Sequence, residues 1–256
     1  MPNISLLLIT KNESVNLDKW KTWLTSLKPI NELVVIDSQS TDDTVKKIKG
    51  LTSPKLKVKI FEAENPSDFS SLRSQALSHC TNNWILWLDA DESPSNKLIQ
   101  FINNFDFSNY NYTFLRQDLF IGQILKHGET ANQHFLRLFD KRHGKFIGQV
   151  HEVWQSSKEM TQTNYVINHH SHPSLYTFFQ KLNLYSTLRA NELRQQGIRT
   201  NIFLIVFYPI AKFFQNYFIF QGFLDGTAGI IFALGMSFHS FLVRAKLWHS
   251  SQPSSH

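Results

Sequence analysis

Acidic and polar side chains occur in three short clusters, each of which follows an apolar run. The clusters are Thr10 with Lys11, Asn12 and Glu13; Asp37 with Ser38; and Asp89 with Asp91 and Glu92. Crowded carboxylates repel one another unless a cation lies between them. Hard oxygen ligands in an open arrangement suit Mg²⁺ or Mn²⁺, which can bridge a diphosphate. An Asp-x-Asp directly after the apolar run WILWL therefore predicts a divalent-cation site.

The clusters can meet only if the preceding runs form neighbouring strands. Apolar or alternating runs predict strands over 4–9, 32–36, 57–61 and 84–88. Between these strands the sequence predicts three helices. One covers 17–27, one begins after Thr41 as its cap, and one begins after Ser67 as its cap. This βαβαβαβ order predicts an α/β fold with a mainly parallel, Rossmann-like sheet flanked by helices. Ligands bind such sheets at the carboxyl ends of the strands.

The rest of the chain predicts an extension followed by helices. A helix is expected over 97–105 and strands over 112–120 and 133–139, with glycines marking turns in an antiparallel extension. An apolar stripe predicts a helix from Ser174 to Gln196, stopped by Gly197. Residues 201–243 are apolar, with charges only at Lys212 and Asp225.

Charge is distributed unevenly along the chain. The formal net charge is +6. From residue 173 onward the chain has seven Lys or Arg but only two Asp or Glu, and this part also holds 17 of the 35 aromatic residues. We expect domains at 1–172 and 173–256, with the helical, aromatic-rich second part lying peripherally on an anionic membrane surface. A packed helical subdomain or a homo-oligomer interface is the alternative, and the uncharged stretch 226–243 is near the lower limit for a spanning helix. The basic residues are too sparse for nucleic acid.

Several other classes find no support in the sequence. The single Cys80 excludes a disulfide scaffold, and the start of the chain predicts a cytosolic protein without a signal peptide. The cluster His169, His170 and His172 fits no standard zinc spacing, so packing or an acceptor-side role is expected instead. Phosphate-binding glycine motifs of kinases and dehydrogenases are absent from the sequence.

Three segments carry a family resemblance. LLLITKNES, VVIDSQSTDDT and LRSQALSHCTNNWILWLDADE resemble the first strand, the second strand and the metal motif of family 2 glycosyltransferases, which have a GT-A fold. The resemblance covers residues 1–95 and implies a nucleotide-sugar-binding half there, with 96–172 as the acceptor half. It implies that Thr10, Glu13 and Asp37 contact the nucleoside and that Arg73 faces the diphosphate. Asp89 and Asp91 would flank Mg²⁺ or Mn²⁺, with Asp91 as the direct ligand.

A further segment, HFLRLFDKRHGKFIGQVHE, resembles bacterial lipopolysaccharide core glucosyltransferases and peptide-modifying relatives. Inverting transfer needs a base to deprotonate the acceptor hydroxyl, and the resemblance implies Glu152, with His151 beside it and Asp140 as the alternative. The implied function is transfer of a hexose from a UDP-sugar to a lipid-linked inner-core sugar, with glucose as the first-choice hexose. A polyprenyl phosphate or peptide acceptor, and an inactive membrane-bound scaffold, are the competing interpretations.

Overall fold

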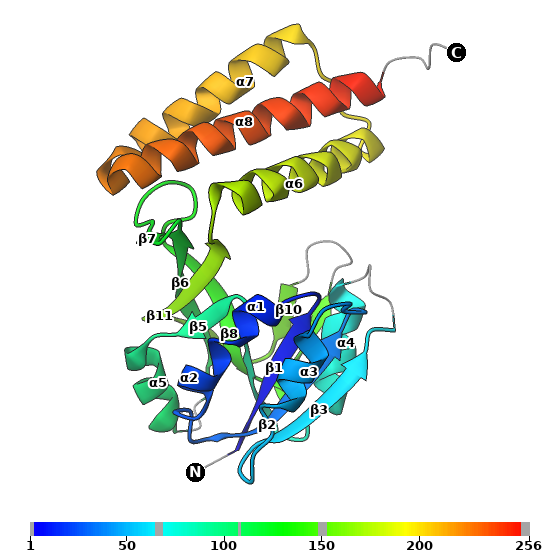
Figure 1. Cartoon of the computed structure of the whole chain (residues 1–256), viewed down its shortest axis with the longest axis vertical. Helices are drawn as coiled ribbons and strands as arrows, with labels where there is room; N and C mark the ends of the chain where they lie inside the picture. The colour runs from blue at the N-terminus through cyan, green and yellow to red at the C-terminus, as the bar shows by residue number, and fades with distance from the viewer. Residues whose placement is uncertain (1–2, 65–68, 107–108, 148–152, 252–256) are drawn as a thin grey trace. The chain divides into compact units, whose positions relative to one another are not determined.

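A computed structural model describes residues 3–64, 69–106, 109–147 and 153–251. The chain forms two compact units (Figure 1). Unit 1 comprises residues 1–116 and 134–169, and unit 2 comprises 117–133 and 170–256.

Four parallel strands form the first half of the sheet in unit 1, as the sequence predicts. They are β1 (Ile4–Thr10), β2 (Ile30–Asp37), β3 (Lys57–Glu62) and β4 (Trp84–Trp87). Their spatial order is β3-β2-β1-β4, with β1 pairing in parallel with both β2 and β4. Because the strands are parallel, their carboxyl ends share one edge of the sheet.

The sheet continues through antiparallel strands. Beyond β4 the order is β8-β6-β11-β5, that is β8 (Gln133–Asp140), β6 (Asn111–Phe120), β11 (Met160–His172) and β5 (Glu92–Pro94). β7 (Gln123–Ile124) pairs with β6, while β9 (Gly144–Ile147) and β10 (Val153–Ser156) form a separate hairpin. The strands β6 and β11 continue from unit 1 into unit 2.

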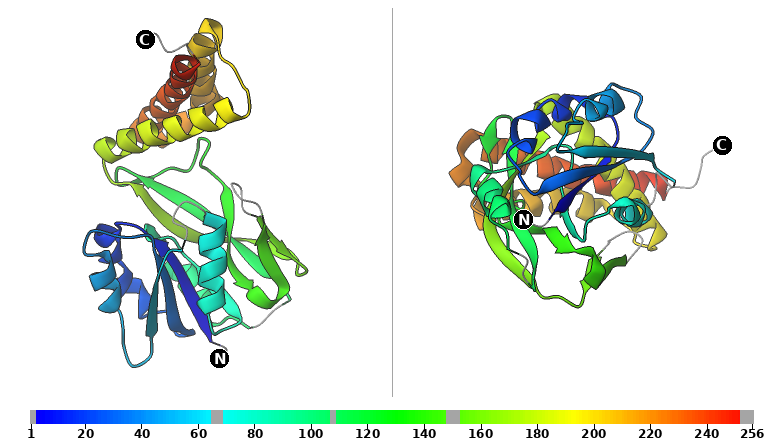
Figure 2. Two further views of the ribbon diagram at one scale, coloured as in Figure 1. Left: turned by 90° about the vertical axis from the view of Figure 1, so that its right-hand side faces the viewer. Right: turned by 90° about the horizontal axis from the view of Figure 1, so that it is seen from below.

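Helices cover both faces of the parallel strands (Figures 1 and 2). One apolar core lies under α1 (Ser14–Leu17), α2 (Trp20–Leu24), α3 (Thr44–Lys49) and α5 (Asn96–Asn103). The other lies under α4 (Phe69–His79) and the β9–β10 hairpin. Successive strand residues alternate between the cores, as Leu6 and Leu8 face one and Leu7 faces the other.

Two helix expectations need correction. Thr41 does not cap α3, which begins at Thr44; the Asp42 carboxylate accepts the Thr44 backbone N–H at 3.0 Å instead. The apolar spacing over 17–27 belongs to two short helices, α1 and α2, rather than one. A local hydrogen bond from the Asp42 side chain accompanies the later start of α3, and a turn at Asp18–Lys19 separates α1 from α2.

Unit 2 is built on three helices. They are α6 (Leu175–Gln195), α7 (Ile202–Phe214) and α8 (Gly226–Ser250), with a π-helical turn (Gln215–Ile219) and a 3₁₀ turn (Gly222–Asp225) between the last two. The helix expected from Ser174 to Gln196 is present as α6, and Ser174 caps it with a capping box. Gly197 ends it at φ 73°, donating to the Arg194 carbonyl while Ile198 donates to Leu193, which is a Schellman motif.

Residues 117–133 belong to unit 2, so the division differs from the expected boundary at 172. The reason is packing: the buried Phe120 contacts the rings of Phe178 and Phe232. The Asp225 carboxylate also accepts the backbone N–H groups of Lys126 and His127, at 3.0 and 2.8 Å. A loop from the middle of the chain therefore shares a core with the C-terminal helices.

Two helical segments of unit 2 are long and apolar enough to cross a membrane, Ile202–Ile219 and Gly222–Ser250. Only 6% of the first is buried, against 33% of the second. The stretch 226–243 lies in the second segment.

Candidate functional site

The loops after β1 and β2 are joined by hydrogen bonds at the carboxyl edge of the sheet. Thr10 stands opposite Asp37 in the parallel register, and its carbonyl accepts the Ser38 N–H at 2.8 Å. The Asn12 N–H donates to Ser40 Oγ at 2.9 Å, and the Thr41 N–H donates to Asn12 Oδ1 at 2.8 Å. The two strand ends therefore form one connected rim.

The residues expected to bind a nucleoside lie on this rim. The Asp37 carboxylate is buried and accepts both the backbone N–H and the hydroxyl of Ser40, at 2.9 and 2.6 Å. Thr10 is buried too, and its hydroxyl has no hydrogen-bond partner among the described residues. Glu13 accepts a hydrogen bond from Asn16 at 2.6 Å at the start of α1.

The segment Asp89–Glu92 is held in place from two sides. The Trp20 indole of α2 donates to the Ala90 carbonyl at 3.0 Å. The Glu92 carboxylate accepts the Asp89 backbone N–H at 3.1 Å, while the Glu92 N–H donates to the Asp89 carbonyl at 3.0 Å. The segment is thus a closed turn directly after β4.

A buried arginine from β8 binds two of these carboxylates. One terminal nitrogen of Arg137 lies 2.7 Å from Asp89 Oδ2 and 2.6 Å from Glu92 Oε1. Burial by itself would lower the pKa of Arg137, but Asp89 and Glu92 hold it above its usual range. Burial raises the pKa of the Glu92 carboxyl, against the opposing effect of Arg137. Asp89 keeps 42% of its side chain exposed.

His169 lies beside Asp91, with Nε2 3.3 Å from Asp91 Oδ2. This contact exists because β11 pairs with β5, which sets His169 opposite Glu92. A carboxylate oxygen and an imidazole nitrogen are both ligands that Mn²⁺ accepts. Among the described residues no group of three or more His, Cys, Asp or Glu could hold an ion alone. His172, by contrast, packs its ring against Phe178 at 4.9 Å within unit 2.

Arg73 approaches the same strand from α4. Its guanidinium carbon lies 4.3 Å above the Trp87 ring, and the Phe146 ring of β9 is 5.7 Å away. Trp87 is the last residue of β4, so Arg73 reaches the strand end that carries Asp89. The Arg73 side chain is half-buried in this position.

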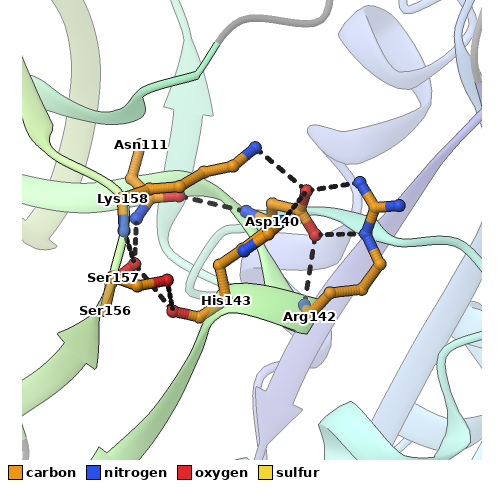
Figure 3. A network of polar contacts seen from close by, with 7 residues as sticks. All are labelled: Asn111, Asp140, Arg142, His143, Ser156, Ser157 and Lys158. Carbon is orange, nitrogen blue, oxygen red and sulfur yellow. Dashed lines mark hydrogen bonds and ion pairs between the residues drawn. The ribbon is translucent and has the colours of Figure 1, made fainter.

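The alternative base, Asp140, lies elsewhere. It pairs with Trp84, the first residue of β4, and therefore sits at the opposite end of that strand, about 16 Å from Asp89 by strand rise. Arg142 binds it through two nitrogens at 3.0 and 2.7 Å, and Lys158 binds it at 3.1 Å (Figure 3). Its fully buried carboxylate is a structural anchor.

The first-choice base Glu152 and its neighbour His151 lie outside the described residues. The strands that flank them, β9 and β10, are described and pair with each other. Phe146, one residue before the end of β9, contacts the Trp87 ring edge-on at 5.6 Å. The hairpin therefore reaches the carboxyl end of β4.

Sequence reasoning missed Arg137 and the role of His169. A lone arginine in the apolar strand HFLRLF is itself a signal, because a buried cation needs paired acids. Its partners, however, depend on the pairing of β8 with β4.

Known proteins provide an independent comparison. The model of "Glycosyl transferase family 2" matches residues 5–147. A protein named as an uncharacterized glycosyltransferase of Rickettsia felis is 30% identical over 272 residues, covering 98% of this chain and 91% of the relative. The lipopolysaccharide core biosynthesis glycosyltransferase LpsC of Rhizobium meliloti is 25% identical over 253 residues, covering 96% and 92%.

Among solved structures, the mannosyltransferase PcManGT from Pyrobaculum calidifontis, in complex with GDP-Man and Mn²⁺, is similar in fold. The two structures align with a TM-score of 0.54 at 14% sequence identity, and the alignment covers 98% of this chain and 88% of the mannosyltransferase. The match with the family model spans more than half of the chain and includes every strand of the carboxyl rim. This chain therefore belongs to glycosyl transferase family 2 and has the GT-A fold.

Proposed function

We propose that the protein is an inverting, metal-dependent hexosyltransferase that moves a hexose, glucose for preference, from a UDP-sugar to an inner-core sugar of lipopolysaccharide or lipooligosaccharide. The observation that carries this proposal is the braced segment Asp89–Glu92 on the same sheet edge as Thr10 and Asp37. The distant similarity to LpsC supports the acceptor class.

In this proposal the rim after β1 and β2 binds the nucleoside through Thr10, Glu13 and Asp37. The Thr10 hydroxyl, which has no partner among the residues that the structure describes, suits a donor or acceptor group of the ligand. Arg73, stacked on Trp87 at the end of β4, would face the diphosphate. The nucleoside contacts are the same in the ground and transition states, so they would govern donor binding more than turnover.

Asp91 and Asp89 would hold Mg²⁺ or Mn²⁺, with His169 beside Asp91. When bound, the cation would stabilise the departing diphosphate. A site with so few protein ligands agrees with Mg²⁺ sites that use one or two carboxylates and complete their coordination with substrate phosphates. Arg137 would keep Asp89 and Glu92 in place, since its guanidinium contacts both carboxylates.

Glu152 is the proposed base, which would take the proton of the acceptor hydroxyl, and His151 would orient it or contact the acceptor. Support comes from the flanking hairpin, whose Phe146 contacts Trp87 beside the strand end. Asp140 is a poorer candidate because Arg142 and Lys158 neutralise it at the other end of β4.

The acceptor is lipid-linked in this proposal, and the protein works on the cytoplasmic face of the inner membrane without spanning it. The exposed apolar surface of α7 supports membrane association, as do the basic residues of unit 2.

The decisive experiment is a screen for donor hydrolysis and transfer across nucleotide sugars in the presence of Mn²⁺. We expect one UDP-hexose to be preferred, EDTA to abolish activity reversibly, and Asp91→Asn to abolish it permanently. Asp106→Asn, which changes an exposed acid, is the matched control and should retain activity. Full activity in EDTA would exclude the metal-dependent mechanism.

A further inference from the structure

A cavity of about 460 Å³ lies between α6, α7 and α8, entirely within unit 2. Its lining includes three cations, Arg189, Lys212 and Arg244, together with the polar side chains of Gln215, His239 and Ser240. Nothing in the proposed transfer reaction uses these residues.

The three cations differ in how they are neutralised. Lys212 forms an ion pair with Glu129, and Arg189 pairs with Glu192 at 2.6 Å. Arg244 has no acidic partner among the described residues; its guanidinium stacks on the Tyr208 ring at 4.1 Å. Stacking fixes the plane of the guanidinium while leaving its N–H donors to bind another group. The cavity therefore contains one positioned cation without a counter-charge.

The same cavity is bordered by the apolar surface of α7. Tyr208 and Ile219 line the cavity and are exposed by 46% and 72%. Tyr208 belongs to α7 and Ile219 to the π-helical turn after it, and Phe203, Phe207 and Phe214 of α7 are each more than half exposed. An uncompensated arginine beside such a surface matches a ligand with an anionic head and apolar chains.

We propose that this cavity binds the phosphate headgroup of an anionic membrane lipid, with Arg244 as its principal ligand. The inference rests on the proposed membrane association but not on the transfer chemistry. The phosphate oxygens would accept from the Arg244 guanidinium, a charge-assisted contact that Arg makes in a bidentate manner. The acyl chains would then lie along the exposed aromatic face of α7.

The test is flotation of the full chain with vesicles of phosphatidylcholine alone or mixed with phosphatidylglycerol. We expect the wild-type protein to bind both kinds of vesicle and to prefer the anionic ones. In Arg244→Gln the ratio of binding to anionic over neutral vesicles should fall by about five- to tenfold. Arg194→Gln removes an equal charge from an exposed position of α6 and should keep most of it. Thermal unfolding of each variant verifies the fold.

Equal losses in the two variants would show diffuse charge attraction and overturn the cavity proposal, as would a wild-type protein without anionic preference. Binding of inorganic phosphate by the wild type that Arg244→Gln abolishes, with vesicle binding unchanged, would assign the cavity to a soluble ligand instead. Failure to bind any vesicle would contradict membrane association itself, a result distinct from loss of the anionic preference alone.

Discussion

At the scale of single residues, Arg137 connects the acidic turn after β4 to the rest of the sheet. The guanidinium bridges Asp89 and Glu92, and Glu92 in turn accepts the Asp89 backbone N–H. Removing one partner of a buried ion pair commonly costs 3–5 kcal/mol, so truncation risks unfolding. A conservative change is therefore the sharper probe of a positioning residue.

We expect Arg137→Lys to fold but to bridge the two carboxylates poorly, because an ammonium lacks the planar fork of a guanidinium. Positioning residues around metal ligands typically contribute about 10- to 100-fold in metal affinity or activity. The Mn²⁺ concentration for half-maximal activity should therefore rise, with the donor KM less affected. Arg142→Lys, at the Asp140 pair, is the control, and an unchanged Mn²⁺ titration in Arg137→Lys would reduce Arg137 to a structural role.

The proposed base gives a second prediction. Glu152→Gln keeps the shape of the side chain and removes its capacity to accept a proton, so kcat should fall by about 10²- to 10⁴-fold with donor binding nearly intact. Glu159→Gln, an exposed neighbour in sequence, is the matched control. If Asp140→Asn loses turnover while Glu152→Gln keeps it, the base is Asp140 and the Val-His-Glu resemblance is misaligned.

The sequence predicts some of these residues and misses others for a physical reason. Thr10 and Asp37 end parallel strands and Asp89 comes just after another, and the carboxyl ends of parallel strands must share an edge, so the proximity of these residues is predictable. Arg137 and His169 reach the same site only through antiparallel pairings between β8 and β4 and between β11 and β5. Alternation within a strand does not reveal which distant strand it will pair with.

At the scale of elements, Asp140 anchors the turn between β8 and β9. Its carboxylate also accepts the Arg142 backbone N–H at 3.1 Å, which caps the short 3₁₀ turn (Lys141–His143). Burial by itself would raise the pKa of Asp140, but hydrogen bonds from Arg142 and Lys158 hold it below its usual range. The stabilisation is therefore present above pH 4, where the unfolded carboxyl is ionised, and is lost as pH falls toward the folded pKa.

We expect Asp140→Asn to lower the free energy of unfolding at pH 7 by about 1–3 kcal/mol, since Arg142 and Lys158 lose a charged acceptor. Urea denaturation from pH 7 down to pH 3 should show that the difference in the free energy of unfolding between wild type and variant becomes smaller below about pH 4. Asp106→Asn should show no such difference. A difference of constant size at every pH would mean that packing, not charge, is responsible.

Close packing of α6 against α8 depends on Gly235. A Cβ at this position would lie 2.3 Å from the Cε1 atom of the buried Phe178 ring. Gly235→Ala should therefore destabilise unit 2 by about 1–3 kcal/mol despite the better helix propensity of alanine. Adding Phe178→Leu should cost less than the sum of the single changes, measured as a double-mutant cycle. Strict additivity would show that the two side chains do not compete for space.

Helix ends in this chain show what local sequence can specify. The helix starts at Ser174 and stops at Gly197 as predicted, because a cap and a left-handed glycine need only neighbouring backbone. The π-helical turn at Gln215–Ile219 and the 117–133 loop that packs beside it were not foreseen. There the Asn216 side chain accepts the Glu129 N–H at 3.0 Å, a contact between positions far apart in sequence.

At the scale of the whole molecule, the two units differ in what they leave exposed. Unit 1 buries continuous apolar strands and gathers its acids at one sheet edge. Unit 2 leaves most of Ile202–Ile219 uncovered. A spanning arrangement of this segment would put Lys212, its ion pair with Glu129 and the loop backbone near the bilayer centre. That is costly in hydrocarbon, which favours an interfacial position.

We therefore expect the full chain to co-sediment with membranes and to be released by alkaline carbonate. High salt should weaken the association, because surface attraction is screened within about 8 Å at physiological ionic strength and within less at higher salt. Phe207→Glu, which puts a charge on the exposed face of α7, should reduce the bound fraction, whereas Glu64→Gln, an exposed change in unit 1, should not. Release by detergent alone, with resistance to both salt and carbonate, would instead establish Ile202–Ile219 or Gly222–Ser250 as a spanning helix.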